Sequence, residues 1–117
     1  MKDFDFDCLV VGGGTVGLTA VLELSRLGFS VVFIEKYRPK KGPFDLNTYI
    51  RNVSISHASY ELLNRHIDLP VQHASEFGSM VVWEEAGTEV LRFEAQDAGR
   101  DQLGWGFEVT PLHEDLW

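Results

Sequence analysis

The sequence predicts an α/β fold that opens with a strand, a helix and a second strand, and continues into a β-hairpin or meander. A short, continuous apolar run at 8–11 is typical of a strand buried on both faces of a parallel sheet. Apolar residues then recur at helical spacing from 15 to 27, and a second apolar run follows at 30–35. Together these segments have the length of one βαβ unit, which we place at 5–36.

Gly28 is expected to end the helix of this unit as its C-cap, and the crossover is expected to be right-handed. Residues 37–70 are expected to form a loop and then a helix. Ser56 can cap that helix, and Pro70 lies beyond its end. The loop contains the turn-forming residues Pro39, Gly42, Pro43 and Asn47.

Residues 79–109 are expected to form a β-meander. An apolar strand at 80–83 is followed by a turn at Ala86 and Gly87, after which apolar and polar residues alternate. The segment 103–109 is expected to be the third strand of the meander.

Residues 110–117 are expected to start a further helix. Thr110 is interpreted as its N-cap and Pro111 as its first helical residue. Because the sequence stops soon after this helix begins, we interpret 1–117 as a single incomplete, apparently truncated domain.

Composition and charge argue against several classes of function. The 117 residues carry a net charge of −8 and no basic stripe, so the chain is not expected to bind nucleic acid. A single cysteine excludes an internal disulfide and any zinc site that needs several cysteines. The acidic start lacks the apolar run of a signal peptide, and no segment has the length of a membrane span. We therefore expect a cytoplasmic protein.

The remaining chemistry-bearing residues form no recognisable catalytic arrangement. Trp83, Trp105 and Phe107 are large enough to stack on a ring-shaped ligand, but large apolar residues on strands are more often part of the core. The basic residues between 36 and 41 either form a solvated loop or face an anionic ligand. The histidines lack metal-site spacing and are interpreted as surface or capping residues: His57, His66, His73 and His113.

Glycines cluster between the first strand and the first helix, and three of them fit the pattern G-x-G-x-x-G. Gly12 permits a tight turn, Gly14 lets the backbone approach a pyrophosphate, and Gly17 lets the helix pack closely on the sheet. The N-terminus of the helix then offers unpaired N–H groups to the phosphates. Gly13, the extra glycine, has no role that the sequence assigns.

A carboxylate at the end of the second strand makes the glycine pattern more specific. Glu35 follows Gly17 at the spacing at which such sites bind the ribose hydroxyls of the nucleotide. Its charge would repel a 2′-phosphate, which favours FAD or NAD over NADP at this site. The sequence therefore predicts a Rossmann-like site for an adenine dinucleotide, and the motif does not choose between FAD and NAD.

Three stretches, 5–36, 51–65 and 80–109, resemble the flavin-dependent aromatic hydroxylases of ubiquinone biosynthesis, within the class A, para-hydroxybenzoate hydroxylase-like monooxygenases. The first looks like the FAD-binding opening of that family, and the second is similar to its Arg-x-x-Ala-Leu-Ser-x-Ala-Ser segment. The third is the most specific to the ubiquinone branch. Its matching residues are Met80, Val82, Trp83, Gly87, Phe93, Ala95, Leu103, Gly104 and Glu108.

The resemblance implies that the glycines bind the FAD pyrophosphate, Glu35 the adenosine ribose, and Arg51 the flavin side of the cofactor. It also implies a reaction in which NAD(P)H reduces the flavin and one atom of O2 enters an aromatic or quinol ring. No catalytic residue and no metal ligand can be named. The expected cofactor-binding residues are Gly12, Gly14, Thr15, Val16, Gly17, Glu35, Lys36 and Arg51.

The same resemblance raises the expectation of a peripheral contact with the inner membrane or with a multiprotein complex of ubiquinone synthesis. Apolar sheet edges left uncovered would favour self-association. Two alternatives stay open: a fragment of an NAD-dependent oxidoreductase, and a non-catalytic fragment that binds a nucleotide without turnover.

Overall fold

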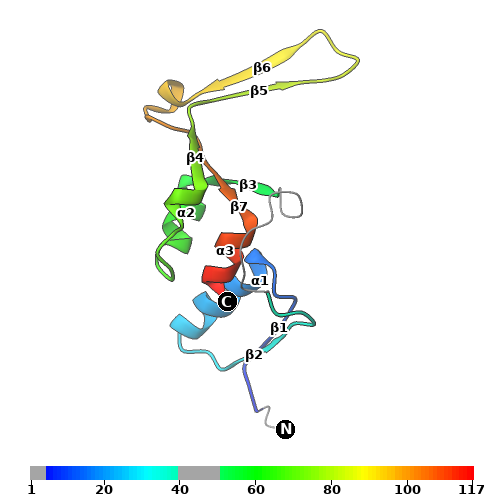
Figure 1. The fold of residues 1–117 in the computed structure, drawn as a ribbon, viewed down its shortest axis with the longest axis vertical. Coiled ribbons are helices and arrows are strands. Elements are labelled where there is room, and N and C mark those ends of the chain that lie inside the picture. Colours follow the sequence, from blue (N-terminus) through cyan, green and yellow to red (C-terminus); the bar gives the residue numbers. More distant parts are fainter. Residues whose placement is uncertain (1–4, 40–50) are drawn as a thin grey trace.

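A computed structural model describes residues 5–39 and 51–117, and the turn-forming residues predicted at 42, 43 and 47 lie outside this part of the chain. Two 3-10 helices, Val71–His73 and Ala95–Ala98, accompany the main elements. In chain order these are β1 Cys8–Val11, α1 Thr15–Arg26, β2 Val31–Ile34, β3 Asn52–Ser56, α2 His57–Leu63, β4 Ala74–Phe77, β5 Ser79–Trp83, β6 Val90–Glu94, β7 Gly104–Glu108 and α3 Val109–Leu116 (Figure 1).

The predicted βαβ unit is confirmed. β1 and β2 pair in parallel, with Cys8 opposite Val31 and Val11 opposite Ile34, and α1 connects them. Gly28 follows α1 with a φ of +90°, a conformation that favours glycine. Two hydrogen bonds close the helix end: the Gly28 N–H donates to Ser25, and the Phe29 N–H donates to Leu24. This is the Schellman pattern, in which Leu27 is the C-cap residue and Gly28 follows it, so Gly28 ends the helix from one position beyond the predicted C-cap.

The second sheet differs from the sequence prediction. It contains three antiparallel strands in the order β3-β7-β4. β3 lies where a loop and a helix were expected, and β4 lies between 70 and 79, where no element was predicted. β7 therefore pairs with these two strands and not with the hairpin, so 79–109 is not a continuous meander. Strand pairing between segments far apart in the sequence depends on the fold, whereas sequence patterns report only local periodicity.

The helix predictions are partly confirmed. Ser56 caps α2, with its side chain accepting from the Ser59 N–H. Thr110 is not a cap: α3 begins at Val109, with Glu108 as the N-cap residue. The Val109 N–H donates to the Arg51 carbonyl at 2.9 Å, so strand β7 passes directly into the helix.

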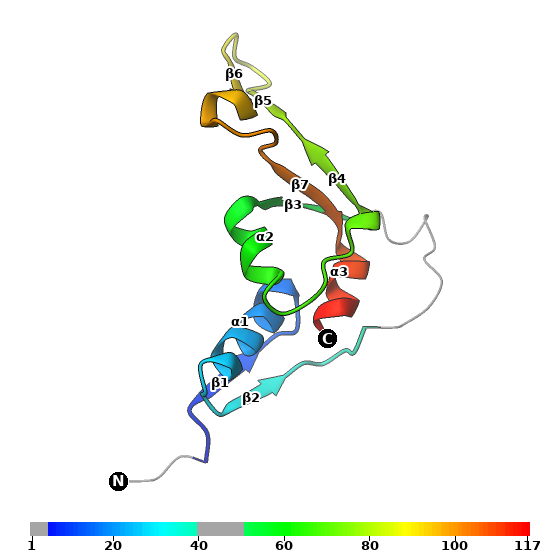
Figure 2. The same cartoon turned by 90° about the vertical axis from the view of Figure 1, so that its left-hand side faces the viewer.

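The core forms where α3 and β7 meet α1, β3 and α2 (Figure 2). Phe107 of β7 and Leu112 of α3 are the largest fully buried side chains. Leu18, Ile55, Leu63, Leu69 and Leu116 complete the buried cluster. Because its members come from both ends of the chain, the core joins the βαβ unit to the three-stranded sheet. No helix among the described residues is long and apolar enough to cross a membrane.

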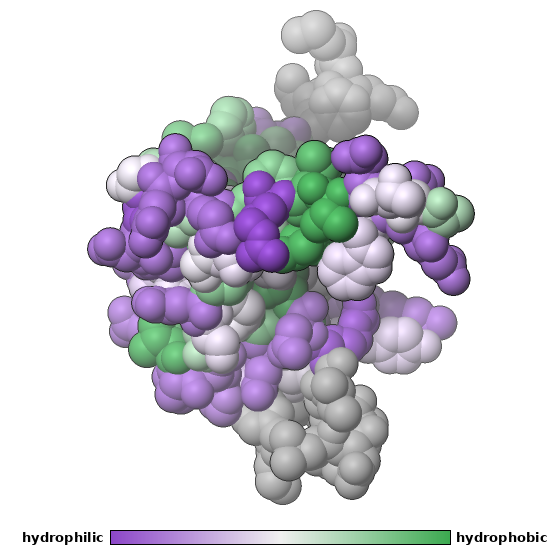
Figure 3. Space-filling view, turned by 90° about the horizontal axis from the view of Figure 1, so that it is seen from above, coloured by the Kyte–Doolittle hydropathy of each residue, from purple (hydrophilic) through white to green (hydrophobic). Residues whose placement is uncertain are grey.

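β5 and β6 form an antiparallel hairpin that projects from the rest of the molecule (Figure 1). The Cα radius of gyration is 18.0 Å, whereas a compact domain of about 100 residues has a value of about 13 Å. Trp83, expected in the core, is 70% exposed because the hairpin is remote from it. Figure 3, a view from the hairpin end, shows apolar side chains in green among hydrophilic ones in purple.

One face of the hairpin is entirely apolar, since Met80 lies opposite Phe93 and Val82 lies opposite Leu91. All four of these side chains are exposed. Apolar faces of this kind usually mark an interaction surface or an aggregation site.

The two glycines of β7 give a stability prediction. A Cβ at Gly104 would come within 3.0 Å of the Ile55 carbonyl oxygen, whereas one at Gly106 would make only an ordinary contact, 3.8 Å from the Ser75 oxygen. Gly104→Ala should therefore lower the free energy of unfolding by about 1–3 kcal/mol, because the backbone of β3 must move. Gly106→Ala is the control and should be neutral or slightly stabilising. Urea denaturation checks this, and equal effects of the two variants would contradict the packing described.

The apolar hairpin face leads us to expect concentration-dependent self-association. Val82→Glu places a charge on this face and should shift the chain toward the monomer, as measured by analytical ultracentrifugation. Val81→Glu is the matched control. It makes the same change in charge, but Val81 lies on the opposite face of the hairpin, across from Arg92. A wild-type chain that stays monomeric at all concentrations would refute the expectation.

Candidate dinucleotide-binding site

The glycine turn joins the end of β1 to the start of α1. Gly12 has a φ of +103°, which favours glycine, and its N–H donates to the Ile34 carbonyl at 2.9 Å. Gly17 lies in the first turn of α1, directly against the Gly12 carbonyl, where a Cβ has no space. The turn and the helix are thus held together by two positions at which a side chain is excluded.

Gly14 lies in a different environment. Its φ of −72° and ψ of 176° are accessible to any residue, and a Cβ there would meet nothing within 4 Å. The N–H groups of Gly14, Thr15 and Val16 donate to no other described residue. These are the free donors that a helix N-terminus provides, next to open space and at the positive end of the α1 dipole. A phosphate can therefore approach the backbone here.

Gly13 has a structural role that the sequence analysis missed. It is buried between the exposed Gly12 and Gly14. Its N–H donates to Glu35 Oε2, and a Cβ would lie 2.7 Å from the Glu35 Cγ and 2.9 Å from the Phe33 ring. Three consecutive glycines, where the motif requires only the first and third, were the signal that could have revealed it.

Glu35 is held against the turn by backbone donors. Oε1 accepts from the Tyr37 N–H at 2.8 Å, and Oε2 accepts from the Gly13 N–H. These two bonds hold the pKa of Glu35 below its ordinary value of 4.5, and the bond from Tyr37 has the larger effect. The carboxylate is therefore charged at neutral pH. Each of its oxygens has two lone pairs, so it can still accept from ribose hydroxyls.

The structure brings most of the predicted site residues together. Gly12, Gly14, Thr15, Val16 and Gly17 form one continuous segment, and Val16 is 85% exposed. Glu35 touches that segment through Gly13.

The two predicted basic residues are not part of this contact. Lys36 follows Glu35, but its Nζ lies over the Tyr37 ring, 5.0 Å from the ring centroid. Arg51 has an exposed side chain that forms no hydrogen bond or ion pair with another described residue. Its carbonyl accepts from Val109 at the start of α3.

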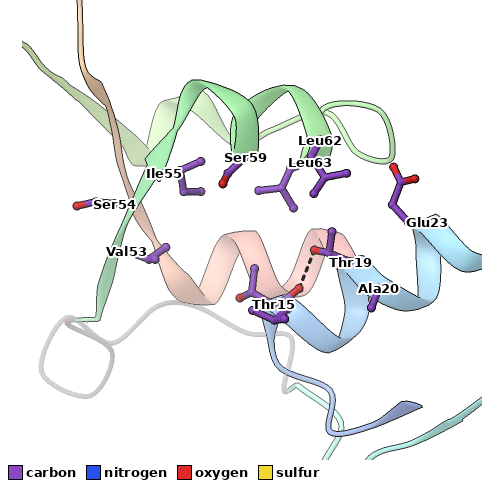
Figure 4. Close-up of a pocket in the computed structure, with 11 residues that line it drawn as sticks. Thr15, Thr19, Ala20, Glu23, Val53, Ser54, Ile55, Ser59, Leu62 and Leu63 are labelled. Atoms are coloured by element: carbon purple, nitrogen blue, oxygen red, sulfur yellow. Dashed lines mark hydrogen bonds between the residues drawn. The ribbon is translucent and has the colours of Figure 1, made fainter. Parts of the chain in front are cut away.

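A pocket of about 440 Å³ opens beside the start of α1 (Figure 4). Its walls come from α1, β3 and α2, and the residues that line it are mostly apolar or hydroxyl-bearing. Thr15 and Val16, the first residues of α1 after the glycine turn, line the pocket. The Thr19 hydroxyl donates to the Thr15 carbonyl at 2.7 Å, so this hydroxyl group of the pocket lining has a partner. Glu23 lies at the far end (Figure 4).

The histidines act as hydrogen-bonding partners within the fold. His57 Nε2 lies 2.8 Å from the Gln102 carbonyl, and His73 lies 3.3 Å from the Glu108 carboxylate. His66 lies just beyond α2, and its side chain is buried against Glu23 of α1, so it is not a surface residue. His113 contacts the Gly13 carbonyl. Within the described ranges, no three His, Cys, Asp or Glu side chains are placed to hold a metal ion.

The lowered pKa of Glu35 gives a pH prediction. A carboxylate whose folded-state pKa is depressed stabilises the fold above its unfolded-state pKa, and this stability is lost as pH falls through the folded pKa. Wild type should therefore be more stable than Glu35→Gln at neutral pH, and the difference should shrink below the ordinary value of 4.5. Urea denaturation of both proteins from about pH 7 to about pH 2.5 measures this. A difference independent of pH would show that charge on Glu35 contributes nothing.

Solved structures share this fold. A flavoprotein/dehydrogenase from Cytophaga hutchinsonii superposes with a TM-score of 0.59 at 19% identity, over 95% of this chain and 26% of that protein. The 2,6-dihydroxypyridine-3-hydroxylase from Arthrobacter nicotinovorans superposes with a TM-score of 0.53 at 21% identity, over 99% of this chain and 27% of that protein. The flavin-dependent monooxygenase PieE, in complex with FAD and substrate, superposes with a TM-score of 0.51 at 25% identity, over 99% of this chain and 22% of that protein. The chain thus spans about a quarter of the length of these proteins.

A comparison with curated proteins found no match. The family described as FAD binding domain matches residues 5–65, just over half of the chain. This range contains the βαβ unit, the glycine turn, Glu35 and the strand that follows Arg51. The chain therefore belongs to the FAD binding domain family.

Proposed function

We propose that this chain is the FAD-binding portion of a flavin-dependent monooxygenase. The observation that carries the proposal is the combination of free N–H donors at Gly14–Val16 with a charged carboxylate, Glu35, which follows β2 and is held against the same turn. Together they suit the pyrophosphate and the ribose of one adenine dinucleotide. The family match supports FAD as that dinucleotide.

The residues present fit such a cofactor. Gly14 borders open space that any side chain would reduce, and Glu35 retains lone pairs for ribose hydroxyls. Thr15 and Val16 add backbone donors at the positive end of α1. Arg51 supplies a guanidinium suited to a phosphate, and Lys36 adds a second positive charge.

The pocket beside Thr15 and Val16 suits a different part of the cofactor. Its lining is apolar apart from hydroxyl groups and the distant Glu23. Phosphates would find few donors there, whereas an aromatic ring system would bury apolar surface. We therefore assign this pocket to the flavin side of the cofactor.

When bound, FAD supplies the redox chemistry, and the chain itself binds the cofactor and positions it. NAD(P)H as the reductant and O2 as the oxygen source form part of the proposal. Two of the solved structures support this class of reaction. PieE is a flavin-dependent monooxygenase in complex with FAD and substrate, and the Arthrobacter protein is named a hydroxylase.

An aromatic or quinol substrate of the ubiquinone-biosynthesis type is the finer part of the proposal. Its support is the resemblance over 80–109. Those residues form the hairpin and β7, so the resemblance lies in the part of the fold that extends away from the glycine turn. Contact with a multiprotein complex or a membrane surface belongs to the same proposal.

Gly14→Val tests the cofactor site directly. The substitution should abolish FAD binding, since the side chain would occupy the space that we assign to the pyrophosphate. Folding should be retained, because the backbone angles of Gly14 suit any residue and nothing lies within 4 Å of its Cβ position. Flavin fluorescence quenching measures binding, and circular dichroism measures folding.

Gly78→Val is the matched control. A Cβ at Gly78 also has room, since its nearest neighbour would be 3.8 Å away, and Gly78 lies far from the glycine turn in sequence. This variant should bind FAD as wild type does. Normal FAD binding by Gly14→Val would refute the proposed site. A wild-type chain that binds NAD and not FAD would favour the NAD-dependent alternative.

A further inference from the structure

A hydrogen bond from the far end of the chain reaches the glycine turn. His113 of α3 lies 100 residues from Gly13 in sequence, and its Nε2 contacts the Gly13 carbonyl oxygen. A carbonyl oxygen only accepts hydrogen bonds, so Nε2 must carry the proton that is donated. The neutral imidazole satisfies this as its Nε2–H tautomer.

This contact determines the direction of a neighbouring donor. The Gly13 carbonyl and the Gly14 N–H belong to one peptide group, and no described peptide bond is cis. In a trans peptide the C=O and the N–H point in opposite directions. Because His113 holds the carbonyl toward α3, the Gly14 N–H points away from α3, where it meets no described acceptor.

Gly13 needs such a restraint. Glycine has the widest choice of backbone conformation, so the peptide group that follows it can flip at low cost. A flip would replace the Gly14 N–H with the Gly13 carbonyl oxygen, which repels a phosphate. The Gly13 N–H is already restrained by Glu35, and His113 restrains the peptide on the other side of the same residue.

His113 is itself held in place by packing. Its ring makes an edge contact with Trp117, at 6.3 Å between centroids, and Trp117 makes another with Phe33 of β2, at 5.5 Å. Leu112 and Leu116, its neighbours on α3, are buried in the core. The imidazole therefore belongs to a helix that is anchored in the core.

We propose that His113 is a positioning residue that orients the Gly14 N–H toward a bound diphosphate. The proposal rests on the proposed nucleotide site and adds a residue from outside its motif. The proposal predicts different effects on the two halves of the ligand. Loss of the His113 bond should weaken binding of the phosphates and leave binding of adenosine unchanged.

ADP and adenosine are the probes, with binding to the full chain measured by isothermal titration calorimetry. His113→Leu should weaken ADP binding about tenfold, the value of roughly one well-placed hydrogen bond, and should leave adenosine binding unchanged. His113→Gln should restore most of the ADP affinity, because its side-chain amide can donate from a similar position. His57→Leu is the matched control, since it removes another bond from a histidine Nε2 to a backbone carbonyl, that of Gln102.

Unchanged ADP binding in His113→Leu would overturn the proposal. Equal losses for ADP and adenosine, or the same loss in His57→Leu, would also overturn it, because they would indicate general destabilisation. A wild-type chain that binds neither probe would refute the nucleotide site itself.

Nuclear magnetic resonance then tests the turn without a ligand. The His113 ring should be protonated at Nε2, and the Gly14 amide resonance should shift in His113→Leu but not in His57→Leu. An unprotonated Nε2 or an unmoved Gly14 resonance would refute the restraint.

Discussion

The close approach of Gly17 to the Gly12 carbonyl is the constraint on which the site depends. With no Cβ at residue 17, α1 begins directly against the end of β1, and its first N–H groups lie at the edge of the parallel sheet. Leu18 then enters the buried core. One missing side chain thus determines both the packing of the first helix and the position of the free donors.

The last strand and helix hold the rest of the fold to this unit. Phe107 and Leu112 are fully buried, and α3 runs back along α1 to the glycine turn (Figure 2). β7 also pairs with strands on both of its sides. The glycine turn is therefore contacted by a residue far away in sequence, since His113 of α3 meets the Gly13 carbonyl.

The electrostatics of the site are local. A chain with a net charge of −8 would repel an anionic ligand at long range, but charges separated by more than about 8 Å are largely screened at physiological ionic strength. Close to the turn, the positive end of α1 would attract the phosphates of the proposed ligand. Glu35 keeps its negative charge there because backbone donors depress its pKa. Under the proposed function, that charge would attract ribose hydroxyls and oppose a 2′-phosphate.

The sequence by itself determined the βαβ unit, the hairpin strands and the core of the candidate site. Apolar periodicity and glycine conformation are local properties, so the positions of α1, Gly12, Gly17 and Gly28 follow from nearby residues. The strand β3 was missed, although Asn52–Ser56 alternates polar and apolar residues, because a run of five residues is a weak signal beside a strong helix cap.

Only the tertiary structure decided which strands pair and what surrounds the glycine turn. The pairing of β7 with β3 and β4, the exposure of Trp83 and the start of α3 at Val109 all depend on contacts between distant segments. The roles of Gly13 and His113 have the same origin. A hydrogen bond across 100 residues leaves no periodic pattern in the sequence, because its two partners meet only when the core has formed.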